Sequence, residues 1–280
     1  MPDPTGTLHH FAEQALGPCE VAASPAGNPG SGFVVRIRDS RGCEYVAKRH
    51  TTASKHAREV HAYRHWAPAL GTGTARLLAA DAQTMTILIT GLPGRPAGGP
   101  GDARYCHRQA GALLRLFHDA EPAQPLPGFQ HWLHDRISWW HQQSAPLLSA
   151  EDQRVIDHHL TALRALGAPD GGPGHFDFQP RNWLVDRDGT VRVIDFEHAR
   201  IGLQARDFTR LHFRYWASRP RLRDAFFDGY QRWPTAAEQQ AVINCGAIDA
   251  LTALARGAQT GDSTLVSHGR AALARLRDEG

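Results

Sequence analysis

The stretch HFDFQPRNWLVDRDGTVRVID, residues 175–195, decides the fold. Asp177 and Asn182 lie in a segment that contains a proline and has no helical period, so we expect a loop that directs both side chains to one point. Two short strands joined by a turn at Arg187-Asp-Gly189 should follow as a hairpin and return Asp195 to the side of Asn182. The sequence therefore predicts that two carboxylates and one amide converge.

Carboxylate and amide oxygens are the hard ligands that Mg²⁺ prefers, and Mg²⁺ usually keeps waters and substrate phosphates as its other ligands. A carboxylate that stays free of the metal can orient a substrate hydroxyl or accept its proton. These are the parts needed for phosphoryl transfer, in which the protein mainly positions groups and neutralises charge. The alternative for Asp177, Asn182 and Asp195 is that they are ordinary turn-forming and capping residues.

The N-terminal part of the chain supplies a candidate cation. Only two of the 31 basic residues are lysines, Lys48 and Lys55, so a retained lysine is a candidate for a role that needs a compact ammonium. Lys48 ends a predicted strand, and an ion pair with Glu59 on the following predicted helix would hold it in place. For Lys55 we expect no special role. The glycine-rich segment at 27–32 would let backbone N–H groups approach phosphate oxygens, although a plain surface turn explains it nearly as well.

The patterning predicts an α+β protein with a small β-rich N-terminal lobe and a large, mainly helical C-terminal lobe. Apolar periodicity predicts helices at 7–16, 53–67, 105–119, 130–146, 150–166 and from 207 onward, and strands at 33–38, 44–48, 75–81, 84–90, 183–186 and 191–194. A breaker-rich segment at 91–101 should connect the lobes. We expect an N-terminal lobe at 1–91, a linker at 92–103 and a C-terminal lobe at 104–280.

Composition excludes several classes of protein. The chain is 41% hydrophobic and 21% charged, which is typical of a globular protein, and its net charge of +3 is too small to indicate nucleic-acid binding. It has no run of about 18 apolar residues and no signal-peptide pattern at its start, so we expect a cytoplasmic protein without a membrane span. The four cysteines are never in CxxC spacing, and the 17 histidines show no zinc-binding pattern.

The motif His-x-Asp-x-x-x-x-Asn at 175–182, followed by Ile194-Asp195-Phe196, resembles the catalytic and metal-binding loops of the protein-kinase-like superfamily. Within that superfamily, the chain is most similar to the aminoglycoside phosphotransferase family. The supporting segments are Arg58-Glu59-x-x-x-Tyr63-Arg64, Gly202 followed by Asp207-Phe-x-x-Leu211, and Asp195-Phe-Glu in place of Asp-Phe-Gly. The resemblance implies a protein-kinase-like two-lobed fold.

The resemblance also implies roles for the residues of the loop. Asp177 would be the catalytic base or would orient the acceptor hydroxyl, and Asn182 and Asp195 would hold Mg²⁺. His175 and Asp207 would brace the loop rather than react. Lys48, braced by Glu59, would contact the α- and β-phosphates of ATP. The other implied nucleotide contacts are the backbone near Thr90 and Leu92 for the adenine, and Ser31 and Gly32 for the phosphates.

Two residues depart from the family pattern. Phe176 stands where the family usually has glycine, which should stiffen the loop and adds an aromatic ring of unknown direction. Gln179 stands where the family often has histidine, so the cation that would assist the γ-phosphate is missing from that position. Arg181 or Arg200 could replace it.

The implied activity is an ATP-dependent transfer of the γ-phosphoryl group to a hydroxyl of a polar, cationic small molecule. An aminoglycoside or a basic peptide antibiotic of the capreomycin or viomycin type would fit, and the transfer would give resistance. The alternatives are a kinase for a metabolite such as choline, a sugar or homoserine, and a non-catalytic pseudokinase that binds nucleotide. We expect a monomer or a dimer and no nucleic-acid partner.

The helical lobe offers residues that could line an acceptor site. Its acidic residues could bind the amines of a cationic acceptor or could be solvated surface: Asp119, Glu121, Asp135, Asp224 and Asp228. Its tryptophans could line a cleft, although helix packing is the more common use of such residues: Trp132, Trp139, Trp140 and Trp216.

Overall fold

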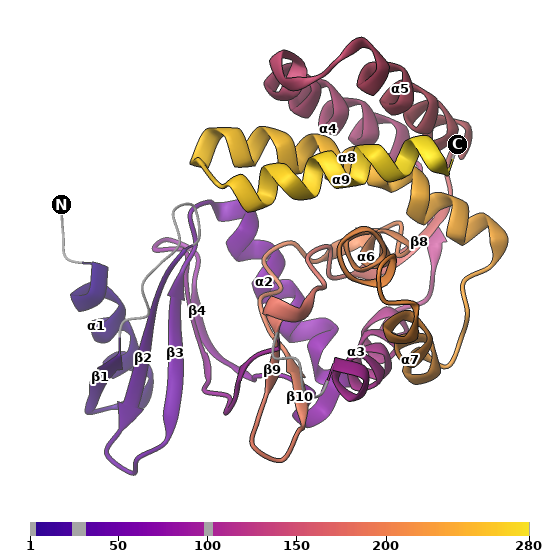
Figure 1. Ribbon diagram of the computed structural model, residues 1–280. Coiled ribbons are helices and arrows are strands. Elements are labelled where there is room, and N and C mark those ends of the chain that lie inside the picture. Colours follow the sequence, from indigo (N-terminus) through magenta and orange to yellow (C-terminus); the bar gives the residue numbers. More distant parts are fainter. Residues whose placement is uncertain (1–3, 24–31, 98–102, 280) are drawn as a thin grey trace.

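The structure, a computed structural model, describes residues 4–23, 32–97 and 103–279 and divides into a sheet-containing lobe and a helical lobe (Figure 1). The predicted α+β class and two-lobed arrangement are confirmed. Within the described ranges, no helix is both long and apolar enough to cross a membrane.

The N-terminal lobe is built on a five-stranded antiparallel sheet with the strand order β1-β2-β3-β5-β4. The strands are β1 (Cys19–Ala23), β2 (Phe33–Asp39), β3 (Glu44–Arg49), β4 (Leu77–Asp81) and β5 (Thr86–Thr90). Of these, β1 was not predicted as a separate strand. Alternate residues of β2, among them Val35 and Ile37, are buried beneath α1 (Pro4–Leu16), where Leu8 and Ala12 meet them. This small core holds α1 against the sheet.

Helix α2 (Ala53–His65) lies between the sheet and the helical lobe in Figure 1. The Thr52 side chain caps its N-terminus by accepting a hydrogen bond from the Lys55 N–H. The buried face of α2 carries Glu59, Val60 and Tyr63, which are spaced as a helix requires for one-sided burial. After α2, the short 3₁₀ helix η1 (Ala67–Gly73) leads to β4, and the apolar residues of α2 join the main core of the helical lobe.

The chain crosses between the lobes after β5. In the crossing segment, β6 (Arg95–Pro96) pairs with β9 (Trp183–Val185), which also pairs with β10 (Val191–Val193) in a three-stranded sheet. The crossing therefore adds a strand beside the predicted hairpin. Another small sheet has the order β11-β8-β7, with β7 (Gln124–Pro125), β8 (Asp170–Gly174) and β11 (Arg200–Gly202).

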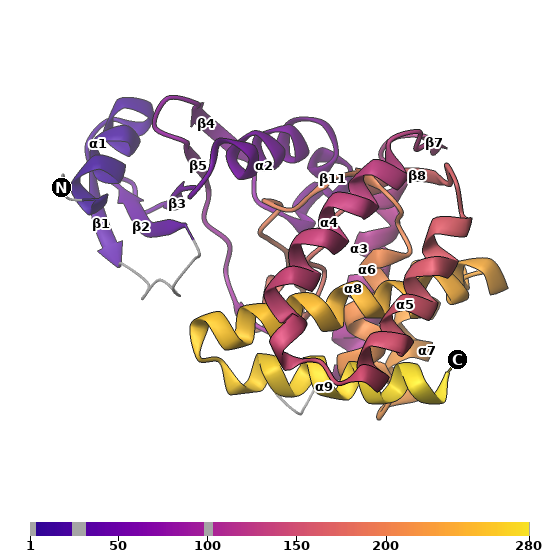
Figure 2. The ribbon, with the colours of Figure 1, turned by 90° about the horizontal axis from the view of Figure 1, so that it is seen from above.

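The helical lobe has two layers. In the first, α3 (Ala103–His118) packs on α7 (Pro220–Tyr230) so closely that a Cβ on Gly229 would lie 1.7 Å from the Arg108 carbonyl oxygen. In the second, α4 (Phe129–Ser144) and α5 (Ala150–Ala165) lie across α8 (Ala236–Thr260) and α9 (Ser263–Asp278), as Figures 1 and 2 show. An apolar core fills the space between these four helices, and α8 contributes most of its small residues.

The remaining elements are short. They are η2 (Ala145–Leu147), the 3₁₀ turn η3 (Pro180–Asn182), α6 (Arg206–Leu211) and the π-helical segment η4 (His212–Trp216). The loop leaves β8, passes through η3 and enters β9, so it starts and ends on sheet strands. This attachment at both ends gives the loop a fixed position between the two lobes.

Candidate active site

The β9–β10 hairpin returns Asp195 to Asn182, as the sequence predicted. The backbone N–H of Ile194 donates to the Asn182 carbonyl oxygen at 3.1 Å, which continues the hairpin pairing by one step. Asp195 itself has a φ of 70°, in the left-handed region that few residues other than glycine adopt. Backbone strain of this kind gathers at functional positions, where the surrounding structure holds it in place.

A cavity of about 360 Å³, which we call the interlobe cavity, lies between the sheet and the hairpin. Both lobes contribute to its lining. The predicted residues that line it are Gly32, Lys48, Glu59, Thr90, Leu92, Asn182 and Asp195. Ser31, predicted together with Gly32, falls outside the described residues. Asp177 lines a different cavity, described below.

Lys48 lies at the centre of a cluster of carboxylates. Its Nζ is 2.8 Å from Oε2 of Glu59, 2.6 Å from Oδ1 of Asp195 and 3.1 Å from Oε2 of Glu197. Although burial lowers it, these three carboxylates hold the pKa of Lys48 well above its usual value. The pKa of Glu59 falls to about 2 because Lys48 and His50 outweigh the opposite effect of burial. The expected Lys48–Glu59 ion pair is therefore present, and it joins β3 to α2.

Sequence reasoning missed Glu197 and dismissed Lys55. Nζ of Lys55 lies 2.7 Å from Oε1 of Glu197, so the two lysines of the chain converge on one carboxylate. The sequence analysis did not foresee this contact, which arises because α2 turns the Lys55 side chain toward Glu197. The rarity of lysine in the sequence was the signal that would have found it.

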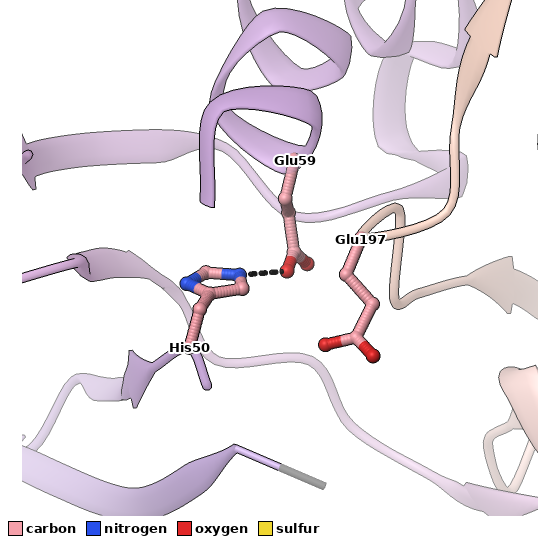
Figure 3. Close-up of side chains that lie close together, drawn as sticks. All are labelled: His50, Glu59 and Glu197. Atoms are coloured by element: carbon pink, nitrogen blue, oxygen red, sulfur yellow. Dashed lines mark hydrogen bonds and ion pairs between the residues drawn. The ribbon is translucent and has the colours of Figure 1, made fainter. Parts of the chain in front are cut away.

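Three side chains of this cluster, His50, Glu59 and Glu197, have the spacing of metal ligands (Figure 3). His50 Nε2 is 2.5 Å from Oε2 of Glu59. The Lys48 ammonium, however, lies within 3.1 Å of both carboxylates. Because a cation of the protein already neutralises these oxygens, the cluster is an ion-pair network that positions Lys48 rather than a metal site.

The Asp177 carboxylate accepts four hydrogen bonds. Oδ1 accepts from Gln179 Nε2 at 2.6 Å and from Arg210, and Oδ2 accepts from Arg181 Nη2 at 2.8 Å and Asn182 Nδ2 at 2.9 Å. Although burial raises it, Arg210 and Arg181 hold the pKa of Asp177 well below its usual range. A low pKa keeps Asp177 ionised at neutral pH, which suits a group that orients a hydroxyl.

His175 and Asp207 brace the loop. The backbone N–H groups of His175 and Phe176 both donate to the Asp207 carboxylate, which also lies 3.0 Å from His118 Nε2. The ring of His175 contacts the Ile194 carbonyl oxygen at 3.1 Å, so it ties the loop to the hairpin. Neither side chain lines the interlobe cavity or the cavity that contains Asp177. These contacts agree with the expectation that His175 and Asp207 brace the loop rather than react.

A second cavity, of about 130 Å³, adjoins the interlobe cavity and is lined by Asp177 and seven arginines. We call it the arginine cavity. Residues that are adjacent in the sequence line different cavities. Asn182 and Glu197 line the interlobe cavity, whereas their neighbours Arg181 and His198 line the arginine cavity. The arginines come from five elements and the 175–182 loop and are Arg58, Arg136, Arg181, Arg200, Arg206, Arg210 and Arg256.

The two residues that depart from the family pattern, Phe176 and Gln179, both pack or bond within the loop and its arginines. The Phe176 ring, whose direction the sequence left open, lies beneath the guanidinium groups of Arg200 and Arg206, at 4.5 and 4.7 Å from the ring centre. Gln179 donates to Asp177 and does not line the interlobe cavity. Two cations were considered as replacements for a cation at position 179. Arg181 lies next to Asn182, which lines the interlobe cavity, whereas Arg200 is stacked on Phe176 in the second cavity.

The acidic residues considered as amine-binding groups lie elsewhere. Among the described residues, none of the five lines the interlobe or the arginine cavity. Asp119 pairs with Arg115, and Glu121 accepts a hydrogen bond from Trp66 Nε1 at 2.9 Å. Of the tryptophans, Trp132 and Trp140 line the arginine cavity, Trp139 is exposed and Trp216 belongs to the core. The interlobe and arginine cavities therefore do not use these acids, which agrees with the alternative that they are solvated surface.

A small sheet lobe with a buried Lys–Glu pair, joined to a helical lobe that carries an Asp–Asn loop, defines a kinase-like phosphotransferase. A family model described as the phosphotransferase enzyme family matches residues 26–240, so the chain belongs to that family. It is a phosphotransferase whose acceptor is an alcohol group. A search of curated protein sequences gave no match.

Solved structures of similar fold agree with this assignment. An aminoglycoside phosphotransferase from Alicyclobacillus acidocaldarius is 20% identical, with a TM-score of 0.57 over 92% of each chain. A thermostable mutant of aminoglycoside phosphotransferase APH(4)-Ia, in ternary complex with AMP-PNP and hygromycin B, is 15% identical, with a TM-score of 0.73 over 98% of this chain and 99% of that chain. Macrolide 2'-phosphotransferase MphH from Brachybacterium faecium is 17% identical, with a TM-score of 0.63 over 98% of each chain.

Proposed function

We propose that this protein is an ATP-dependent O-phosphotransferase and that Asp177 positions the acceptor hydroxyl. The observation that carries the proposal is the 2.9 Å hydrogen bond from Asn182 Nδ2 to Asp177 Oδ2. It joins a residue of the interlobe cavity to a residue of the arginine cavity, so a donor nucleotide in the first and an acceptor in the second would meet at this pair.

The interlobe cavity suits a nucleoside triphosphate. Its lining combines apolar residues of the sheet and the crossing segment, which suit a base, with the Lys48 ammonium, which suits phosphates. The adenine would lie against the backbone near Thr90 and Leu92, and the phosphates would lie near Lys48 and Gly32. The complex of APH(4)-Ia with AMP-PNP supports ATP as the donor by analogy.

Asn182 and Asp195 fit a magnesium ion. Asn182 uses Nδ2 to hold Asp177, which leaves its Oδ1 without a hydrogen-bond donor among the described residues. Asp195 has one oxygen on Lys48 and shares the interlobe cavity with Asn182. When bound there, Mg²⁺ would supply positive charge to the triphosphate.

In the reaction, the acceptor hydroxyl oxygen forms a bond to the γ-phosphorus as the bond from that phosphorus to the β–γ bridging oxygen breaks. ADP leaves with the bonding electrons, and the hydroxyl proton passes by way of Asp177 to solvent. Because the pKa of Asp177 is held low, its main contribution is to orient the hydroxyl, with the proton leaving late in the transfer.

The identity of the acceptor is a separate question. A cationic antibiotic is the acceptor that the resemblance implies, and the hygromycin B complex of APH(4)-Ia supports it by analogy. The lining of the arginine cavity does not favour a cation, because Asp177 is its one carboxylate among the described residues. A metabolite kinase remains the alternative. A pseudokinase is disfavoured because all four residues of the set are present, with Lys48 in contact with Asp195 and Asn182 in contact with Asp177.

The proposal is tested by incubating the purified protein with ATP, Mg²⁺ and a panel of hydroxyl compounds. The panel contains hygromycin B, capreomycin, choline, homoserine, glucose and glucose 6-phosphate, and mass spectrometry detects the phosphorylated product. For the best acceptor, Asp177→Asn should lower kcat roughly 10²–10⁴-fold. Asp188→Asn, an exposed aspartate in the turn of the hairpin, is the matched control. The proposal fails if no member of the panel gives an Asp177-dependent product.

A further inference from the structure

The arginine cavity concentrates positive charge that the protein does not neutralise. Of its seven arginines, Arg181 and Arg210 pair with Asp177. The other five have no carboxylate partner among the described residues: Arg58, Arg136, Arg200, Arg206 and Arg256. Asp249, which borders a small adjoining cavity, is already paired with Arg210 and Arg214.

This concentration of charge is unfavourable in the ligand-free protein. Burial, together with Arg206, Arg210 and Arg256, lowers the pKa of Arg136 to about 9. Burial, together with Arg206, Arg58 and Arg136, also lowers the pKa of Arg200. Nε of Arg136 is buried and has no hydrogen-bond partner among the described residues. Uncompensated buried donors are rare in native proteins, and they point to a ligand that would satisfy them.

Aromatic rings hold these guanidinium groups in position. Trp132 and Phe176 lie against Arg206, with the guanidinium 4.5 and 4.7 Å from the ring centres, and Arg200 contacts the same two rings. Trp140 contacts Arg136 and Arg256 at 5.4 and 5.9 Å. Stacking on a ring face leaves the in-plane N–H donors of arginine free for another group. The cavity is thus a preorganised set of donors.

The position of the arginine cavity suits binding of the acceptor rather than of ATP. The interlobe cavity and the arginine cavity have no lining residue in common, and Asp177 lines the latter. Because the acceptor hydroxyl must reach Asp177, the rest of the acceptor would occupy the arginine cavity. The ATP phosphates would instead lie on the other side of the Asn182–Asp177 hydrogen bond.

We propose, on the basis of the function proposed above, that the acceptor is anionic and carries a phosphate or carboxylate group beside the hydroxyl that is phosphorylated. Guanidinium groups bind both of these groups in bidentate fashion, and phosphate offers the greater negative charge to a cluster of five. Arg136, Arg206 and Arg256 would bind the anionic group while Asp177 orients the hydroxyl. A cationic acceptor would meet repulsion at the same place.

The first test determines the sign of the acceptor's charge from the dependence of KM on salt concentration. Steady-state rates are measured at saturating ATP and Mg²⁺ in 20 and 200 mM NaCl, for pairs of hydroxyl compounds that differ in charge. Glucose 6-phosphate, gluconate, glucose and hygromycin B represent the phosphate, carboxylate, neutral and cationic classes. We expect turnover of the anionic members, with a KM that rises several-fold with salt because screening weakens the attraction.

The second test removes arginines singly. Arg136→Met keeps the contact with Trp140 but loses the charge, and Arg256→Gln changes an exposed residue; both should raise KM for the anionic acceptor roughly 10–100-fold with little change in kcat. Arg154→Gln, an exposed arginine on α5, is the matched control. The melting temperature of ligand-free Arg136→Met should equal or exceed that of the native protein, because a repulsion is lost. An arginine with a merely structural role would give a lower one.

The third test measures binding without turnover. With AMP-PNP and Mg²⁺ saturating the interlobe cavity, millimolar inorganic phosphate should raise the melting temperature of the native protein but not that of Arg136→Met. The inference is overturned if phosphate raises neither, or if only neutral or cationic compounds are phosphorylated and the arginine variants act on them as the native protein does. In that second case the phosphotransferase function stands. Absence of Asp177-dependent turnover with every compound would instead refute the proposed function.

Discussion

Arg181 donates from Nη2 to Oδ2 of Asp177 at 2.8 Å, although 66% of the Arg181 side chain is exposed to solvent. The pair therefore joins an exposed cation to a buried carboxylate. Arg181 also precedes Asn182, which lines the interlobe cavity. This position makes Arg181 a candidate to contact the transferred phosphoryl group in the proposed reaction.

Arg181→Met should lower kcat on the order of 10²-fold, because it removes a donor that can stabilise negative charge on the transferred group. The melting temperature should change by less than about 2 °C, since an ion pair with an exposed partner contributes little to stability. The comparison is with Arg187→Met, an exposed arginine in the hairpin turn. Equal kcat values for the two variants would show that Gln179 is not functionally replaced by Arg181.

Phe176→Gly should destabilise the protein even though it removes strain. Phe176 has a φ of 57°, and relieving a left-handed conformation gains about 1–2 kcal/mol. Its side chain is only 8% exposed, and deletion of a buried phenylalanine costs about 3–5 kcal/mol. The loss is larger, so the free energy of unfolding should fall by about 1–4 kcal/mol in urea denaturation.

Met85→Gly is the matched comparison for this substitution. Met85 has a φ of 54° in the turn before β5 and is half-buried, so relief of strain should offset or exceed the lost contacts. The two glycine variants should therefore differ in their effect on stability. If Phe176→Gly stabilised the protein as much as Met85→Gly, the ring of Phe176 would not be a packing element beneath Arg200 and Arg206.

His107 should make the protein less stable in acid. Burial lowers its pKa to about 4 despite a 2.7 Å hydrogen bond from Nδ1 to the Ala103 carbonyl oxygen. The unfolded chain, with a histidine pKa near 6.5, takes up the proton first. The contribution of neutral His107 is therefore complete above about pH 6.5 and is lost as the pH falls toward 4, by up to about 3 kcal/mol.

Urea denaturation at pH 7 and pH 5 tests this dependence. His107→Leu should lose less stability than the native protein between these two values, while His158→Leu, at an exposed position on α5, should follow the native protein. Identical pH dependence in all three would mean that His107 accepts a proton in the folded state without cost.

Lys48→Met should destabilise the fold because it leaves Glu59, Asp195 and Glu197 without their shared cation. At pH 7 the cost should be about 3–5 kcal/mol. The loss should become smaller at pH 5, since the pKa values of the unpaired carboxylates rise above their unfolded values and protonation then favours the folded state. Lys55 pairs with Glu197 and with no other carboxylate among the described residues, so Lys55→Met should lower the free energy of unfolding less at pH 7. A loss for Lys48→Met that grows in acid would contradict this account.

The individual helices, the strands and the 175–182 loop could be predicted because the sequence patterns that specify them each span only a few residues. The β9–β10 hairpin was set by alternating residues around one turn, and it fixed the relation of Asn182 to Asp195. The pairing of Lys48 with Glu59 followed from a strand and the next helix. The role of Glu197 could not be predicted because its partners, Lys48 and Lys55, are more than a hundred residues away in the sequence.

The sequence by itself therefore determined the two-lobed fold and the place of Asn182 beside Asp177 and beside the hairpin strand that leads to Asp195, since helix and strand periods and loop spacing act over a few residues. Only the tertiary structure decided the character of the arginine cavity. Its arginines come from α2, α4, η3, β11, α6 and α8, and a net charge of +3 gives no sign that they meet. Electrostatic interaction depends on distance in space, and the packing of separate helices sets that distance.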